Sequence, residues 1–101
     1  MADGLEIFDA TFNTLEHAMR VATMKQDVIA HNIANARTPG YEPMTFDEEL
    51  MRAVKRQDNK QVVLEEELKD LARNSGKYSA MTKFMASKIN ILKNVVTQGK
   101  K

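Results

Sequence analysis

The residues that could carry acid–base or metal chemistry are scattered along this sequence rather than grouped. His17 and His31 are fourteen residues apart, about 21 Å along a helix, so they cannot share one metal ion. Three consecutive glutamates at 65–67 have the position of a solvated helix start, where they complement the helix dipole. Cys is absent, which excludes thiolate nucleophiles, disulfides and Cys-based zinc sites. The sequence therefore indicates a protein that is not an enzyme, with no catalytic, cofactor-binding or metal-binding residue.

Two long segments carry apolar residues at alternating steps of three and four, the pattern of helices that pack side by side. The first predicted helix covers residues 5–36 and the second covers 64–97, about 48 Å and 50 Å at ~1.5 Å per residue. Matched lengths indicate an antiparallel pair. Gln26, Ser75 and Thr82 are the weak positions of the apolar seam between them. The predicted seam consists of Phe8, Phe12, Leu15, Met19, Ile29, Ile33, Leu68, Leu71, Tyr78, Met85, Ile89 and Leu92.

The connecting segment, residues 38–61, begins with a strong helix stop. It opens with TPGY at 38–41, where the residue before Pro leaves the helical region and Pro-Gly suits a type II turn. Thr45 and Glu48 have capping-box spacing, so a short helix is expected from about 46 to 56, followed by a polar linker. The predicted fold is all-α. It is a single domain, residues 1–101, built as an antiparallel, coiled-coil-like hairpin of two long helices with a short helix and loop between them.

Charge is divided unevenly along the chain. Residues 1–50 carry three basic and nine acidic residues, whereas residues 51–101 carry twelve and five. An acidic half that faces a basic half within one hairpin accounts for this asymmetry without a partner. A nucleic-acid or membrane-surface role for the basic half would require strongly salt-dependent binding. No apolar run reaches the ~20 residues that span a membrane, and the N-terminus lacks the layout of a signal peptide.

A second apolar stripe is predicted on the face of each helix opposite the seam. Single surface apolar residues are common, but two stripes at helical spacing favour contacts with other subunits. A two-helix hairpin buries one seam only, and this burial roughly offsets the conformational entropy lost on folding. Neighbouring molecules are therefore expected to complete the fold. The subunit-contact candidates are Val21, Met24, Val28, Phe84, Ile91 and Val95.

The longest motif reads HNIANARTPGY at residues 31–41. It resembles the element that follows the N-terminal helix of flagellar rod, hook and hook-associated proteins. Phe46, Leu50 and the sequence VLEEEL at 63–68 are similar to the basal-body rod members of that family, many of which are longer between these elements. The matching motif and turn residues are Asn32, Ile33, Ala34, Asn35, Ala36, Thr38, Pro39, Gly40 and Tyr41.

This resemblance implies a structural subunit of the proximal, periplasmic rod of the flagellar basal body. Members leave the cytoplasm through the flagellar type III export apparatus without a cleaved signal peptide, and their terminal helices pack together and against neighbouring subunits. The implied partners are copies of the chain, other rod proteins, the hook–basal-body adaptor, and the export gate and ring. Nucleic acid, cofactors and a direct lipid anchor are not implied. The alternative is a cytoplasmic helical adaptor or export chaperone that acts as a dimer.

Overall fold

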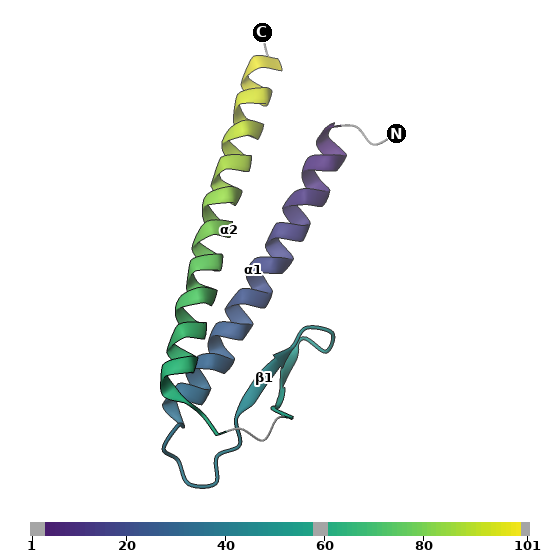
Figure 1. The fold of residues 1–101 in the computed structure, drawn as a ribbon. Coiled ribbons are helices and arrows are strands. Elements are labelled where there is room, and N and C mark those ends of the chain that lie inside the picture. Colours follow the sequence, from purple (N-terminus) through teal and green to yellow (C-terminus); the bar gives the residue numbers. More distant parts are fainter. Residues whose placement is uncertain (1–3, 58–60, 100–101) are drawn as a thin grey trace.

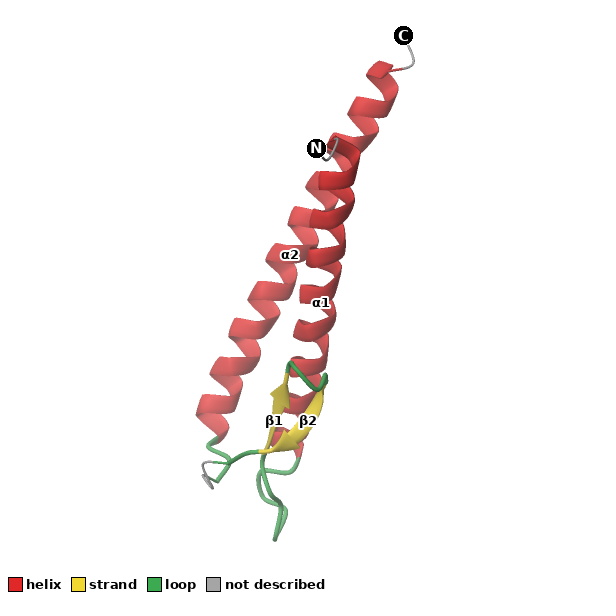
Figure 2. Cartoon of the chain, turned by 90° about the vertical axis from the view of Figure 1, so that its right-hand side faces the viewer, coloured by secondary structure: helices red, strands yellow, loops and turns green. Residues whose placement is uncertain are grey.

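The computed structural model describes residues 4–57 and 61–99, which form two long antiparallel helices and a small β-hairpin (Figures 1 and 2). Helix α1 spans Gly4–Ala34 and helix α2 spans Leu64–Gly99. Strand β1 spans Met44–Asp47 and strand β2 spans Arg52–Lys55. The molecule extends over 66 × 25 × 14 Å, so it is a thin rod with little interior. The predicted pair of long helices is confirmed.

Helix α1 ends at the residues that the motif supplies. The Asn35 side-chain amide and backbone N–H both donate to the His31 carbonyl, at 2.9 and 3.1 Å. The Thr38 N–H donates to the Asn35 carbonyl at 3.0 Å. Gly40 has a φ of 76°, and the Tyr41 N–H donates to the Thr38 carbonyl at 3.2 Å, which is the geometry of a type II turn. Pro-Gly at this point therefore turns the chain back towards α1.

The predicted short helix at about 46–56 is wrong, because this segment forms the β-hairpin instead. Strands β1 and β2 pair antiparallel, with Thr45 opposite Val54 and Phe46 opposite Ala53. Threonine, phenylalanine and valine all suit a pleated, half-buried surface. Capping-box spacing alone does not make a helix where tertiary contacts favour strands.

The turn of the hairpin shows why the local helix signal fails. The Asp47 carboxylate accepts hydrogen bonds from the N–H groups of Glu49 and Leu50, at 2.9 and 3.0 Å. This arrangement closes a turn rather than opening a helix. Met51 completes the reversal with a φ of 52°. Aspartate therefore organises the loop and leaves the flanking residues free to pair as strands.

Polar residues join the two long helices at the level of the hairpin. The Gln26 amide donates to the Ser75 hydroxyl at 3.0 Å, so two of the weak positions of the predicted seam meet each other. The buried Asn74 amide donates to the Ala22 carbonyl at 2.7 Å and to the Gln26 side chain at 3.0 Å. These bonds set the relative position of the two helices along their axes.

Helix α2 turns towards α1 a face that is displaced from the predicted seam. Its most covered line runs through Glu67, Asn74, Met81 and Lys88, which are seven residues apart. Leu71, Met85 and Leu92 of the predicted seam are half-buried beside this line. The apolar residues of α2 cover such a wide arc that periodicity does not locate its centre. The predicted seam residues that are instead largely exposed are Leu68 at 47%, Tyr78 at 41% and Ile89 at 37%.

The buried apolar core within the described residues is small and consists of Val21 and Ala22. Val21 was expected on an outward face, and this expectation is wrong because it shares the side of α1 with Lys25 and Val28, beside the hairpin. The seam residues of α1 that are half-buried are Phe12, Leu15, Met19, Ile29 and Ile33, while the side chain of Phe8 lies outside the described part.

Candidate subunit interface

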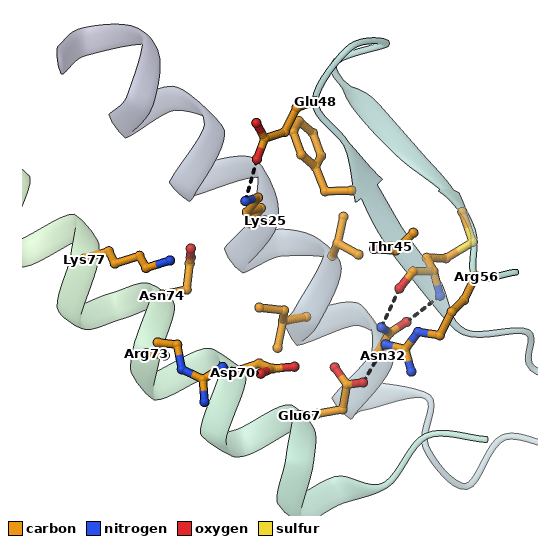
Figure 3. A pocket seen from close by; sticks show the side chains of 14 residues that line it. Lys25, Asn32, Thr45, Glu48, Arg56, Glu67, Asp70, Arg73, Asn74 and Lys77 are labelled. Atoms are coloured by element: carbon orange, nitrogen blue, oxygen red, sulfur yellow. Dashed lines mark hydrogen bonds and ion pairs between the residues drawn. The ribbon is translucent and has the colours of Figure 1, made fainter. Parts of the chain in front are cut away.

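The most buried side chain of the motif is Asn32, which is 1% exposed and fastens β1 to α1. Its amide group donates to the Met44 carbonyl at 2.8 Å, and its side-chain oxygen accepts from the Met44 N–H at 2.9 Å (Figure 3). The same oxygen accepts from the Tyr41 hydroxyl at 2.5 Å. The side chain of Asn32 therefore pairs with Met44 as a neighbouring strand would, and leaves none of its own polar atoms unsatisfied.

Tyr41 covers the same junction from the turn. Its ring meets the ring of His31 edge-on, with centroids 5.6 Å apart. Burial raises the pKa of the Tyr41 hydroxyl, and the nearby Glu67 carboxylate raises it further, whereas Arg56 lowers it. The hydroxyl therefore remains a hydrogen-bond donor to Asn32 at neutral pH, a structural role rather than a catalytic one.

An ion pair ties the end of β2 to the first turn of α2. The Arg56 guanidinium lies 2.7 Å from a Glu67 carboxylate oxygen, and Glu67 is only 3% exposed. The expectation that all three glutamates at 65–67 face solvent is therefore wrong for Glu67. A buried pair of this kind costs desolvation energy, so it fixes the geometry more than it adds net stability. The sequence did not predict this pair, because other charged residues flank both Arg56 and Glu67 and no spacing singles out these two.

A groove of about 320 Å³ lies between the hairpin and α2, with α1 as its floor (Figure 3). We call it the hairpin groove. Its apolar floor includes Val28 and Ile29. Lys25 and Glu48 form an ion pair of 2.6 Å at its rim, and the hydrogen bond from Lys25 lowers the pKa of the Glu48 carboxyl. The charged side chains that line it are paired with one another, except Lys77, so it offers a packing surface rather than a reactive centre.

A second groove, of about 350 Å³, lies on the opposite side of the helix pair, and we call it the back groove. Helix α1 contributes Thr23 and Asp27 to it, and α2 contributes Ser75, Tyr78 and Ser79. Ala22, Ser75 and Ser79 in this lining are small, so another helix can approach closely there. The helix pair therefore has two hollowed faces, one on either side.

Large exposed apolar side chains are concentrated on α2. Among the described residues they form two rows, one on each flank of the face turned towards α1. Such rows are typical of surfaces that other proteins cover. The first row consists of Leu64, Leu68, Tyr78, Ile89 and Val96, and the second consists of the predicted contact residues Phe84 and Ile91. The predicted contact residue Val95 is also exposed, but it lies seven residues beyond Lys88, on the line of α2 that faces α1. The other three predicted contacts lie on α1, where Met24 and Val28 are half-buried and Val21 is buried.

Opposite charges remain separate on the two helices. Residues 4–19 of α1 carry three acidic and no basic side chains, and residues 71–99 of α2 carry five basic and no acidic ones. Six ion pairs among the described residues lie inside a helix or involve the connecting segment. These six pairs do not join the acidic part of α1 to the basic part of α2. Neither described helix is long and apolar enough to cross a membrane.

Comparison with known proteins matches a family model to most of α1 and the turn that follows it. Residues 12–41 fit the family described as flagella basal body rod protein. The flagellar basal body rod protein FlgB of Bacillus subtilis (strain 168) is 30% identical over 129 aligned positions, which cover 95% of this chain and all of the relative. The alignment is longer than this chain, so the relative contains additional residues. The family match includes Asn32 and Tyr41, which hold the hairpin on α1.

Proposed function

Because the chain belongs to the flagellar basal body rod proteins, and is a structural subunit rather than an enzyme, we propose that it builds the proximal, periplasmic part of the rod. It assembles there by packing its long helices against those of neighbouring axial subunits. Its partners are copies of itself, other rod proteins, the hook–basal-body adaptor, and the export gate and ring. It reaches this place through the flagellar type III export route, without removal of a signal peptide.

The exposed apolar rows of α2 are the observation that carries this proposal. Eight of the large apolar side chains of this helix are more than a third exposed, while the buried apolar core among the described side chains consists of Val21 and Ala22. Covering these eight half-exposed groups would contribute on the order of 10 kcal/mol before the costs of association. A neighbour on either flank of α2 therefore supplies the burial that the single hairpin lacks.

The same shape suits export in an unfolded state. A hairpin 14 Å thin with a small core has few tertiary contacts to break before threading, and it has no disulfide to reduce. Local helical patterns and the short turn allow it to refold at its destination without a large core. Assembly onto the rod then stabilises the folded form by mass action, because the neighbours bind only that form.

Gene deletion with matched point variants tests this proposal. Deletion in the source bacterium is expected to abolish motility, and the wild-type gene is expected to restore it. Phe84→Asp should fail to restore motility, because it places a charge in an exposed apolar row. The adjacent exposed change Lys83→Asp is the control and should restore motility. Full motility with Phe84→Asp, or a chain that remains in the cytosol as a discrete dimer, would contradict the proposal and favour the adaptor alternative.

A further inference from the structure

The two grooves define two opposite faces of the helix pair. The hairpin groove is lined by Lys25 and Val28 of α1 and by Lys77 of α2. The back groove is lined by Thr23 of α1 and Ser79 of α2. Helix residues seven apart lie on nearly the same face, so residues at steps of seven from these lining residues lie on the same side of the helix pair.

A row of residues on α2, which we call the basic stripe, continues from the hairpin groove towards the C-terminal end of this helix. Lys77, Phe84 and Ile91 follow one another at steps of seven, and Lys88 and Val95, from the neighbouring line of α2 that faces α1, lie beside them. The Lys88 ammonium lies 5.3 Å from the centre of the Phe84 ring. Phe84, Ile91 and Val95 are exposed, and neither lysine has an ion-pair partner among the described residues. The stripe is therefore apolar in its centre and positive at its edges.

An acidic ridge, Asp9 and Glu16, occupies the back face of α1. These residues precede Thr23 of the back groove at steps of seven. Both side chains are exposed, and Glu16 has only a weak contact of 3.7 Å with Arg20 in its own helix. The ridge is therefore a negative surface on the side of the molecule opposite the basic stripe.

The ridge and the stripe lie at the same level along the molecule. Gln26 of α1 is bonded to Ser75 of α2, and the helices run antiparallel. Each step towards the start of α1 therefore matches a step towards the end of α2. Glu16 is level with about residue 85, and Asp9 with about residue 92, because both helices rise ~1.5 Å per residue. Two copies placed face to back without an axial shift therefore bring Lys88 between the levels of Glu16 and Asp9, with Lys77 about 12 Å from the level of Glu16.

We propose that the basic stripe of one copy receives the acidic ridge of a second copy. The proposal rests on the proposed function as a rod subunit and names the two faces that meet between neighbours of this chain. Charge complementarity identifies a second copy of the chain as the partner, since the chain itself carries a negative surface at the matching level along the helix axes. Different patches meet, so the contact is heterologous and leaves a free stripe and a free ridge at the two ends. Such a contact repeats until a ring closes or a helix grows.

Reversing the charges of the basic stripe or of the acidic ridge tests this contact separately from other contacts between subunits. Variant A carries Lys77→Glu and Lys88→Glu, and variant B carries Asp9→Lys and Glu16→Lys. Each alone places like charges opposite each other, and the amount of the chain per purified basal body should fall about tenfold or more. Co-expression of A and B, or all four changes in one chain, restores opposite charges and should restore the wild-type amount. The control, Lys83→Glu with Lys93→Glu, makes the same charge change off the stripe and should assemble normally.

The rescue distinguishes a lost contact from a lost fold, since an unfolded variant cannot be restored by charges on another chain. Undiminished incorporation of A and B, with the wild-type chain present in basal bodies, would overturn this inference and leave the proposed function standing. Loss with A and B that neither co-expression nor the fourfold variant restores would also overturn it. Absence of even the wild-type chain from basal bodies would overturn the proposed function together with this contact.

Discussion

Replacement of Asn32 by alanine should release the β-hairpin from α1 while leaving both helices in place. The change removes the two hydrogen bonds to Met44 and the acceptor of the Tyr41 hydroxyl. A buried polar group that loses its partner costs about 1–3 kcal/mol. Water can enter the space vacated by the shortened side chain, so the lower value applies to each group and the total is about 3 kcal/mol. This free energy corresponds to about a 100-fold shift in the opening equilibrium of the hairpin.

Hydrogen exchange at single amides measures this opening. The amide of Arg56 donates to the Pro43 carbonyl at 2.9 Å, at the base of the hairpin, and should exchange about 100-fold faster in Asn32→Ala. Amides in the middle of α2 should be little affected. Asn35→Ala is the matched control from the same motif, because its side chain duplicates a bond that the backbone already makes to His31. Equal effects of the two substitutions, or an unchanged Arg56 amide in Asn32→Ala, would refute the role assigned to Asn32.

Three further substitutions and titrations follow from the structure. Glu67→Gln should destabilise the chain by about 3 kcal/mol in thermal unfolding, because it leaves its arginine partner part-buried without a counter-charge; an unchanged Tm would refute this. Tyr41 should ionise at higher pH than an ordinary tyrosine in an ultraviolet titration, and since its folded pKa is raised, the stability it contributes is present below the ordinary tyrosine pKa and lost as pH rises through the folded value; ionisation of Tyr41 at the ordinary tyrosine pKa would contradict it. Val21→Asp should reduce the helical circular dichroism signal, whereas Phe84→Asp should not, because only the first charge is buried; equal losses would refute the assignment of faces.

The long helices were predictable because their apolar spacing extends over many turns. Periodicity over such lengths is a strong signal, and the observed bounds, Gly4–Ala34 and Leu64–Gly99, differ from the predicted ones by at most two residues. The Pro-Gly turn was predictable as well, since Gly40 adopts the positive φ that a type II turn requires. Both features depend on residues that are close together in the sequence, and contacts with distant residues do not easily change them.

The β-hairpin was not predictable from local spacing, because distant contacts hold it. Asn32 and Lys25, more than ten residues away, fasten β1 and its turn to α1. Nothing in the sequence between 44 and 55 reports these contacts, and Thr45 with Glu48 imitates a helix start. Asparagine near a helix end does offer one signal, since it is a poor helix interior residue unless its side chain has a specific partner.

The packed face of α2 was misplaced for a different reason. Apolar residues alone define a seam only when the rest of the helix is polar, and α2 is apolar over a wide arc. The contact with α1 passes instead through Asn74, which hydrogen-bonds the α1 backbone, and through Ser75, which meets Gln26. Polar residues of this kind look like solvent positions in a sequence. The excess of apolar surface is better explained by partners that the single chain lacks.

Quantitative mass spectrometry of hook–basal bodies purified from the source bacterium tests the central claim most directly. A structural rod subunit should be present in every preparation, at a fixed ratio to the other rod proteins, with its N-terminal sequence uncut by a signal peptidase. It should be missing from basal bodies of strains that cannot build a rod. Detection of the chain only in the cytosol, alongside intact basal bodies that lack it, would contradict its assignment to the rod.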